Sequence, residues 1–364
     1  MTGLVCCTLD CNLACTYCYE GNGNITTYPH IQLINEKFEG ARERIIRFID
    51  ELYNYNHEGF TKIIWHGGEP TLIKPELLDS IMSDQIQKEH VNIQWSIQSN
   101  GTLITEKYIE VLKKHNVSIG ISLDGPKKQH DTYRVFKNGK PTFDIIMKNI
   151  DRLMASGVRC GTLITITDNN VDYLMDIYKL FAEKKLNFSF NALFPDRNNT
   201  DAKLNTNEYA KRICDLFDYW ITDTEHQIMI SPFMHIIEGL LKPIRGIPAC
   251  HWSQDCSKGF AAIDTNGDLY PCEHWVGNHE YCFGNIDAGL EHELNNCVYF
   301  SERKDVLEKL DCKECDIWHL CYGGCPWNGW VLFKDSNRKD VSICQGRKII
   351  INHIKEYLKQ HDKL

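Results

Sequence analysis

Short apolar runs alternate with longer amphipathic stretches over roughly the first 225 residues of the chain. The short runs are rich in β-branched and aromatic residues, which is typical of buried strands, and the longer stretches have helical spacing. Strands are predicted at Leu4–Leu9, Lys62–His66, Ile93–Gln98, Val117–Leu123, Arg159–Ile166 and Asn187–Leu193. Six such strand–helix units predict an α/β fold, a partial (β/α)6 barrel of the TIM type, with functional loops at the carboxyl ends of its strands.

The alternation ends after about Pro232, where a segment dense in Cys, Gly, Trp and short turns begins. This segment has few long apolar runs, so we expect metal sites to contribute much of its stability. A final amphipathic helix is predicted over Ile349–Leu358. The sequence therefore predicts two domains, a barrel over residues 1–232 and a smaller Cys-rich domain over residues 233–364.

Composition and charge narrow the class of protein. The 364 residues are 43% hydrophobic, enough to bury a core, and the net charge of −9 comes from scattered residues without a basic stripe for nucleic acid. Met1–Asp10 lacks the basic region of a signal peptide, and no run of ~18 apolar residues could span a membrane. We expect a soluble, cytoplasmic protein that binds neither nucleic acid nor membrane.

The chain holds 17 Cys, an odd and high number. Disulfides suit small secreted proteins, whereas a long chain without a signal peptide favours metal thiolates in a reducing compartment. Three of these Cys, Cys11, Cys15 and Cys18, follow the first predicted strand directly. A four-iron cluster usually takes four Cys, so three with no close fourth leave one iron open for chemistry. The alternatives are a zinc knuckle without its fourth ligand and buried structural thiols, the role we assign to Cys6, Cys7, Cys160 and Cys214.

The spacing of these three Cys, with Tyr17 before the third, resembles the signature of the radical S-adenosylmethionine (SAM) superfamily. The resemblance implies a 4Fe-4S cluster on Cys11, Cys15 and Cys18 whose open iron chelates SAM, with Tyr17 as a candidate contact of the cofactor. It also implies reductive cleavage of SAM to a 5'-deoxyadenosyl radical that abstracts a hydrogen atom. A reductant such as flavodoxin or ferredoxin would supply the electron.

Polar motifs at the ends of later predicted strands resemble the SAM contacts of the same superfamily. Gly67, Gly68 and Glu69 follow the second strand, where two Gly let the backbone approach a ligand and a carboxylate can accept from an ammonium group. Ser122 and Asp124 end the fourth strand and are candidates for further SAM contacts. As alternatives, both motifs are also ordinary turn or helix-cap sequences.

Eight further Cys lie in the C-terminal segment, enough to fill two four-iron clusters or a pair of zinc ribbons. Their spacing resembles the SPASM domain of radical SAM maturases. That resemblance, not the spacing alone, implies a first auxiliary cluster on Cys250, Cys256, Cys272 and Cys325, and a second on Cys312, Cys315, Cys321 and Cys344. Two fully ligated clusters favour electron transfer over direct binding of substrate.

Glu273 directly follows Cys272. In sulfatase-maturating relatives an Asp at this place is thought to deprotonate the substrate, and the resemblance makes Glu273 a candidate base. Here the side chain is one methylene longer, and the alternative is a solvated surface residue.

Three hypotheses for the function follow. The first is an enzyme that matures a ribosomally made peptide by a thioether or carbon–carbon crosslink; because Cys11 lies so near the start, leader recognition would need a separate protein or the barrel itself. The second is an anaerobic sulfatase-maturating enzyme that converts Cys or Ser of a sulfatase to formylglycine. The third is a zinc-stabilised binding protein without catalysis. The first two share a peptide or protein substrate, SAM and three 4Fe-4S clusters.

Overall fold

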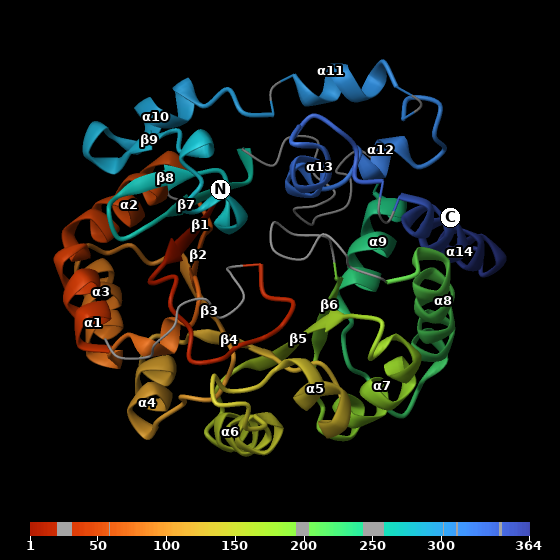
Figure 1. The fold of residues 1–364 in the computed structure, drawn as a ribbon, viewed down its shortest axis with the longest axis horizontal. Coiled ribbons are helices and arrows are strands. Elements are labelled where there is room, and N and C mark those ends of the chain that lie inside the picture. The colour runs from red at the N-terminus through yellow and green to blue at the C-terminus, as the bar shows by residue number, and fades with distance from the viewer. Residues whose placement is uncertain are drawn as a thin grey trace. The chain divides into compact units, whose positions relative to one another are not determined.

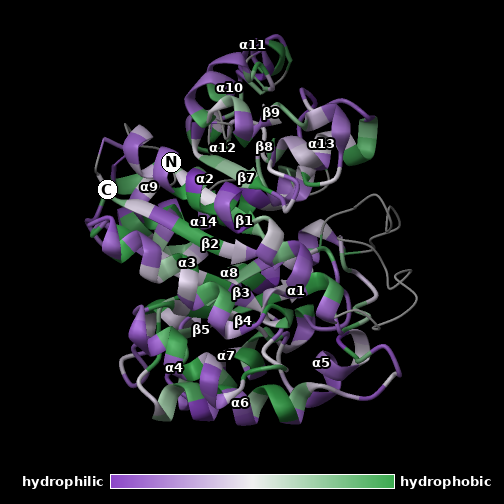
Figure 2. Ribbon diagram, turned by 90° about the vertical axis from the view of Figure 1, so that its left-hand side faces the viewer, coloured by the Kyte–Doolittle hydropathy of each residue, from purple (hydrophilic) through white to green (hydrophobic). Residues whose placement is uncertain are grey.

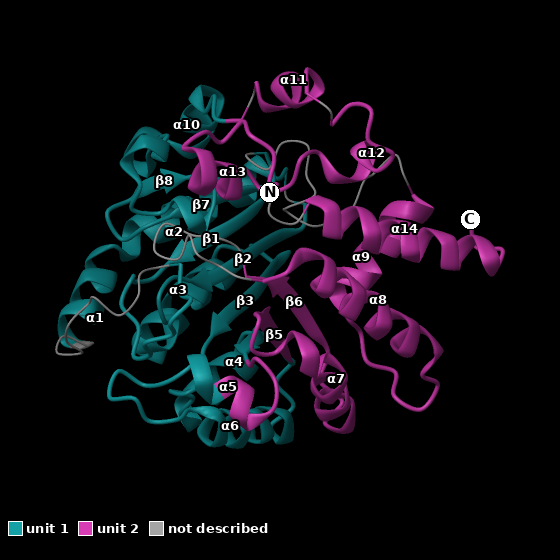
Figure 3. Ribbon diagram, turned by 45° about the vertical axis from the view of Figure 1, so that its right-hand side comes forward, with its two compact units in different colours: residues 1–122, 131–160, 257–299 teal, residues 123–130, 161–256, 300–364 magenta. Residues whose placement is uncertain are grey.

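The computed structural model describes residues 1–19, 31–57, 59–193, 204–242, 258–300, 302–310, 312–341 and 344–364, and its elements are labelled in Figure 1. The chain divides into two compact units. Residues 1–122, 131–160 and 257–299 form the first unit, and residues 123–130, 161–256 and 300–364 form the second (Figure 3). Each unit is assembled from separated stretches of chain, and the division into domains 1–232 and 233–364 stays a prediction.

A sheet forms the centre of the first unit, with its strands in the order β4-β3-β2-β1-β7-β8-β9. The strands are β1 (Thr2–Cys6), β2 (Thr61–His66), β3 (Ile93–Ser99), β4 (Ser118–Ser122), β7 (Phe260–Ile263), β8 (Asp268–Tyr270) and β9 (Gly284–Asn285). The first five pair in parallel, and the last two add antiparallel. The register aligns Val5, Trp65 and Ile97 across β1, β2 and β3, and all three side chains are buried.

Amphipathic helices cover this sheet. They are α1 (Ile31–Gly40), α2 (Arg42–Tyr55), α3 (Pro75–Gln87), α4 (Glu106–Lys114), α6 (Phe143–Ala155) and α10 (Leu290–Asn296), while α5 (Lys127–Tyr133) crosses between the units. Figure 2 shows hydrophobic and hydrophilic residues alternating along α4 and α6, the pattern of helices with one buried face. Helix α2 packs so closely on β1 that a side chain at Gly3 would lie 2.7 Å from Leu52 and 3.0 Å from Phe48.

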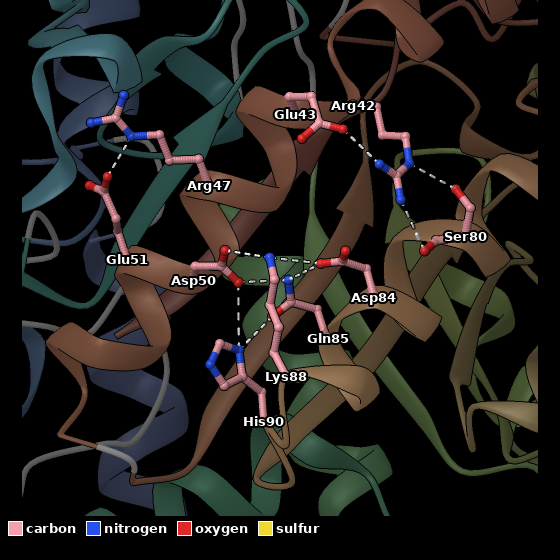
Figure 4. A network of polar contacts seen from close by, with 10 residues as sticks. All are labelled: Arg42, Glu43, Arg47, Asp50, Glu51, Ser80, Asp84, Gln85, Lys88 and His90. Atoms are coloured by element: carbon pink, nitrogen blue, oxygen red, sulfur yellow. Dashed lines mark hydrogen bonds and ion pairs between the residues drawn. The ribbon is translucent and has the colours of Figure 1, made fainter.

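Charged side chains connect the outer faces of α2 and α3. Lys88 Nζ lies 2.8 Å from carboxylate oxygens of both Asp50 and Asp84, and Gln85 donates to Asp50 at 2.8 Å (Figure 4). His90 Nδ1 lies 2.7 Å from Gln85 Oε1 in the same network. Because Lys88 is more than a third exposed, we expect this network to orient the two helices rather than to add much stability.

The second unit holds two strands, seven helices of four or more residues and the end of the chain, among the residues described. They are β5 (Cys160–Ile166), α7 (Leu174–Glu183), β6 (Phe188–Ala192), α8 (Thr206–Thr222), α9 (Ser231–Leu241), α11 (Arg303–Glu308), α12 (Trp318–Cys321), α13 (Pro326–Phe333) and α14 (Cys344–Gln360). Strands β5 and β6 pair in parallel. Helix α14 packs on α8, where the ring of Phe217 meets that of Tyr357 edge to face at 5.4 Å.

The six predicted strands are confirmed, with β1 shorter than predicted. It ends at Cys6 rather than Leu9 because the carbonyls of Thr8 and Asp10 instead accept hydrogen bonds from Gly68 and Glu69, at 2.7 and 2.8 Å. The final helix begins at Cys344, five residues before the predicted start, and includes Gly346. A side chain at Gly346 would lie 2.9 Å from Thr206, so the helix packing requires Gly there. Among the described helices, none has the length and apolar character of a membrane span.

Candidate functional site

The loop after β1 carries Cys11, Cys15 and Cys18. The backbone N–H of Cys18 donates to the carbonyl of Cys15 at 3.1 Å, and the N–H of Leu13 points at Cys11 Sγ at 3.4 Å. Burial raises the pKa of the Cys11 thiol, the carboxylate of Glu69 raises it further, and the thiols of Cys15 and Cys18 add to the effect. The three thiols therefore lie within electrostatic reach of one another, in a place where a bound metal would favour the thiolate form.

The donor set of this loop fits the predicted four-iron cluster. In the described part of the chain, no three His, Cys, Asp or Glu side chains come close enough to share a single metal ion. A four-iron cluster binds each thiolate on a different iron and so needs wider spacing than a mononuclear site. Three thiols from one loop would leave its fourth iron open.

Residues 133–136 anchor the cysteine loop from the other side. The N–H of Ala14 donates to the carbonyl of Val135 at 2.9 Å, and the guanidinium of Arg134 lies 5.3 Å from the ring centre of Tyr17. Arg134 Nη1 also lies 3.9 Å from Cys15 Sγ. Tyr17 is buried in this loop, and its part in binding the cofactor stays a prediction. Arg134 is a neighbour of the Cys15 thiol, and no role was assigned to it from the sequence.

Gly67 and Gly68 hold the segment after β2 against the cysteine loop. Gly67 has a φ of +115°, and a side chain on it would overlap the carbonyl of Thr8. A side chain on Gly68 would overlap the carbonyl of Asp10, one residue before Cys11. Both Gly are therefore needed for the close approach of these two backbones.

The carboxylate of Glu69 is buried and accepts hydrogen bonds from four donors, one of them the hydroxyl of Thr71. Its Oε1 accepts from the N–H of Thr71 at 2.9 Å and from Ser99 Oγ at 2.8 Å, and its Oε2 accepts from the N–H of Asn100 at 2.7 Å. Burial raises the pKa of Glu69, and these hydrogen bonds lower it in part. The geometry fixes a carboxylate at the end of β2, where an ammonium group could be bound.

Asn100 joins Glu69 to the cysteine loop. Its side-chain amide lies 3.6 Å from Cys11 Sγ and donates to Asn12 Oδ1 at 2.7 Å. Asn12 in turn donates to Thr102 Oγ1 at 2.7 Å. Neither Asn100 nor Asn12 was predicted as a site residue, because Asn next to Gly or Cys reads as ordinary turn chemistry in sequence.

Ser122 and Asp124 lie in different units. Ser122 Oγ accepts from Gln98 Nε2 at 3.2 Å in the first unit. Asp124 is buried in the second unit, where its Oδ1 accepts from the N–H of Thr165 at 2.9 Å. Its own N–H donates to His130 Nδ1 at 3.2 Å. These three contacts order the strand ends, and the part of either residue in binding SAM stays a prediction.

Glu273 begins a short 3-10 helix, Glu273–Trp275, and its half-buried side chain lies near His66. Burial lowers the pKa of His66, and the charge of Glu273 opposes that shift. His66 Nδ1 accepts from the N–H of Gly67 at 2.8 Å, so the neutral ring carries its proton on Nε2. The next residue, His274, meets Tyr19 of the cysteine loop at 4.5 Å between ring centres. The structure thus brings the cysteine loop, the Gly67–Glu69 motif and Glu273 together, and adds His66.

The predicted ligands of the second auxiliary cluster gather in the second unit. The N–H of Cys315 donates to the carbonyl of Cys312 at 3.0 Å, α12 ends at Cys321, and α14 begins at Cys344. Burial raises the pKa of Cys344, and the thiols of Cys321 and Cys315 raise it further. The described Cys form no disulfide. For the first auxiliary cluster, Cys250 and Cys256 lie outside the described residues, and Cys272 and Cys325 belong to different units.

A cavity of about 760 Å³ lies in the first unit beside this site. Its lining includes Thr71, Thr102, Tyr108, Asn149 and Arg152, but none of the predicted SAM contacts or cluster ligands. It touches the site only through Thr71 and Thr102, so it is not the predicted SAM site.

Comparison with known proteins agrees with these features. Residues 5–181 match the family model of the radical SAM superfamily. A cysteine-type anaerobic sulfatase-maturating enzyme of Clostridium novyi (strain NT) is 30% identical over 356 residues, which cover 93% of this chain and 91% of that protein. A serine-type anaerobic sulfatase-maturating enzyme of Bacteroides thetaiotaomicron is 28% identical over 96% of this chain and 87% of its own.

Solved structures show the same fold. Native anSMEcpe with bound AdoMet and Cp18Cys peptide is 26% identical and superimposes with a TM-score of 0.82 over 99% of this chain and 98% of that chain. Streptococcus suis SuiB bound to S-adenosylmethionine gives a TM-score of 0.65 over 94% of this chain and 77% of that chain. At 17% identity, SuiB shares the fold alone.

Proposed function

This chain belongs to the radical SAM superfamily, in the family of the anaerobic sulfatase-maturating enzymes, and we propose that it oxidises a Cys or Ser side chain of a sulfatase to formylglycine. It is a radical SAM oxidoreductase that acts on a peptide or protein, with SAM and 4Fe-4S clusters as cofactors. The observation that carries the proposal is the extent of the likeness, 93% of this chain and 91% of the Clostridium novyi enzyme. A match of that extent leaves little of either chain unaligned.

Crosslinking of a ribosomally made peptide, the first hypothesis from the sequence, is less well supported. Relatives that match 96% and 93% of this chain are sulfatase-maturating enzymes of the serine and the cysteine type. A separate leader-recognition protein belongs to the crosslinking hypothesis and stays a prediction. We expect flavodoxin or ferredoxin as the electron donor in either case.

The proposed reaction removes a hydrogen atom, a proton and an electron from the target side chain. Loss of all three turns a Ser hydroxymethyl group into an aldehyde; a Cys side chain loses the same three and then exchanges its sulfur for the oxygen of water, releasing hydrogen sulfide. When bound, the cofactors supply the radical that takes the hydrogen atom and an acceptor for the electron. The chain's own part is to position the reactants and to take the proton.

Specific residues would hold the cofactors and take the proton. Cys11, Cys15 and Cys18 would hold the SAM cluster, and the buried Glu69 would accept hydrogen bonds from the amino group of SAM. Glu273 would take the proton of the substrate hydroxyl or thiol, beside the neutral imidazole of His66. The eight remaining predicted ligands would hold the two auxiliary clusters.

The test uses anaerobically reconstituted protein and two sulfatase peptides that differ only by Cys or Ser at the target position. Iron and sulfide per chain, 5'-deoxyadenosine and peptide mass are measured after addition of reductant and SAM. We expect about twelve irons per chain, 5'-deoxyadenosine, and an aldehyde on at least one peptide. Deoxyadenosine without aldehyde on either peptide would contradict the proposed substrate, and stoichiometric zinc without sulfide would support the binding-protein hypothesis instead.

A further inference from the structure

Arg347 lies beside predicted cluster ligands in the second unit. It follows Cys344 by three residues on α14, so the two side chains share one face of the helix. Its guanidinium packs directly on Gly324, where an added Cβ would overlap Nη1 of Arg347. Gly324 precedes Cys325, and its N–H donates to the carbonyl of Cys321 at 3.0 Å. The guanidinium therefore lies between the start of α14 and the Cys321–Cys325 turn.

Arg347 is a charged side chain without access to water. It is 2% exposed, and its Nη2 lies 3.4 Å from Oδ2 of Asp340, which is 1% exposed. Asp340 is held in turn by Asn328, whose side-chain amide donates to Oδ2 at 2.8 Å. Removing an ion pair from water costs several kcal/mol per charge in general, and the mutual attraction repays this cost only in part. Because the pair is buried, the charge of Arg347 is poorly screened by water.

A second buried cation, Arg303, is stabilised in a different way, by hydrogen bonds to backbone carbonyls. Its guanidinium donates to four backbone carbonyls at 2.7 to 3.1 Å, those of Ser336, Arg338, Gly323 and Gly324. These bonds fix the conformation of the turn between Cys321 and Cys325. Arg303 therefore has a structural role. Arg347 has thiols within its electrostatic reach as well: burial acts against its charge, but Asp340, Cys321 and Cys325 outweigh burial and raise its pKa.

We propose that Arg347 raises the reduction potential of the auxiliary cluster that Cys312, Cys315, Cys321 and Cys344 would hold. The inference rests on the proposed function, which supplies the cluster. A cluster bound by four thiolates gains one negative charge on reduction, and a fixed cation nearby stabilises the reduced form more than the oxidised form. Because the surroundings of Arg347 exclude water, its charge is poorly screened. Arg347 is thus a positioning residue that makes this cluster a better acceptor of the electron that the substrate loses.

The test compares charge variants by redox titration monitored by electron paramagnetic resonance. The titrations use Cys11→Ala/Cys15→Ala/Cys18→Ala protein, which leaves only the auxiliary clusters to report. We expect Arg347→Met to lower the equilibrium constant for reduction about tenfold, which is about 59 mV for one electron. Arg347→Lys keeps the charge and should restore most of the shift. Asp340→Asn removes the opposing charge and should move the potential the other way.

Lys348 provides a matched control on the same helix. It is the next residue, but its side chain is 43% exposed and pairs with the exposed Asp316 at 3.0 Å. Water screens such a cation, so Lys348→Met should leave the potential within error of the parent protein. A role of Arg347 in packing alone would not give Asp340→Asn and Arg347→Met shifts of opposite sign.

Iron analysis separates failure of this inference from failure of the proposed function. Parent protein without about eight irons per chain would contradict the auxiliary clusters themselves. If the clusters are present and Arg347→Met titrates like the parent, the role of Arg347 is overturned while the proposed function stands. If Arg347→Met loses its iron, the potential of Asp340→Asn is the deciding measurement. An unchanged or lower potential in Asp340→Asn contradicts the inference.

Discussion

The carboxylate of Glu69 accepts a hydrogen bond from the backbone N–H of Asn100 at 2.7 Å. Since the side chain of Asn100 lies 3.6 Å from the sulfur of Cys11, one residue links the predicted SAM-amino site to the predicted cluster loop. The end of β3 thus sets the position of this carboxylate relative to the predicted cluster. It belongs neither to the cysteine loop nor to the Gly67–Glu69 motif. The first prediction tests the carboxylate itself.

Glu69→Gln should weaken SAM binding at least tenfold. A hydrogen bond to a charged group contributes about 1.5–3 kcal/mol, and each 1.4 kcal/mol is about a factor of ten in affinity. Equilibrium dialysis of SAM against reconstituted, oxidised protein would measure it. Asn100→Ala is the matched control, because it keeps the backbone bond to Glu69 and should bind SAM more tightly than Glu69→Gln. Affinity of Glu69→Gln equal to that of the wild type would exclude the assigned role.

Cys15→Ala and Cys315→Ala should separate the two kinds of cluster. The first variant should form no 5'-deoxyadenosine, because it lacks a predicted ligand of the SAM cluster. The second should keep part of the SAM cleavage but lose the oxidised peptide, since its missing thiol is a predicted ligand of the second auxiliary cluster. Chromatographic quantification of deoxyadenosine and peptide from the same reaction would show both. Wild-type yields of oxidised peptide from Cys315→Ala would overturn the role of that cluster.

Glu273→Gln should lower the rate of peptide oxidation by about 10²–10⁴-fold, the usual contribution of a general base. Deoxyadenosine should still form, because SAM cleavage does not need the base. Glu273→Asp keeps the carboxylate one methylene farther away and should fall between Gln and the wild type. The ratio of peptide product to deoxyadenosine is the measurement, and an unchanged ratio in Glu273→Gln would make Glu273 a structural residue.

Cys160→Ala and Cys214→Ala should keep the full iron content. Burial raises the pKa of each thiol to about 12, with Asp218 and Asp215 adding to the effect at Cys214. At pH 8 both groups are therefore thiols, and neither should react with iodoacetamide in the folded protein. Labelling should accelerate as the pH rises toward about 12, as mass spectrometry of peptides would show. Iron loss in either variant would add that residue to the ligands.

Ile354→Ala should destabilise the second unit by about 2–5 kcal/mol, the usual cost of removing a buried Ile side chain. Ile354 is fully buried on α14, the helix that begins at the predicted ligand Cys344. Auxiliary iron should therefore be released at a lower temperature than in the wild type, which absorbance on heating would record. Glu356→Ala, an exposed change on the same helix, should stay within about 0.5 kcal/mol. Equal release temperatures for all three proteins would contradict this coupling.

The alternation of apolar runs predicted the α/β fold and all six strands, because each buried parallel strand leaves its own pattern in the sequence. The strands β7, β8 and β9 were not predicted. They are two to four residues long and lie among turns and Cys, so no alternation could develop in them. Their place in the sheet depends on pairing with β1, which is a long-range contact.

The site shows the same division between local and long-range information. The cysteine loop and the Gly67–Glu69 motif are contiguous, and their spacing carries the resemblance to the superfamily. Asn100, Arg134 and Arg347 gained their importance only from burial beside a thiol that is distant in the sequence. Single Asn and Arg residues carry no periodic signal, so physical reasoning on one sequence could not have found them.

The pairing of β7 with β1 sets an order of events during synthesis. Thr2 lies opposite Phe260, so this edge of β1 stays unpaired until most of the chain has left the ribosome. An unpaired parallel strand is a template for association with other chains, and contacts of such sequence separation form slowly. The nascent first unit is therefore exposed to aggregation for the longest part of translation. Slow growth at low temperature, with chaperones present, should favour the yield of folded protein more than faster transcription would.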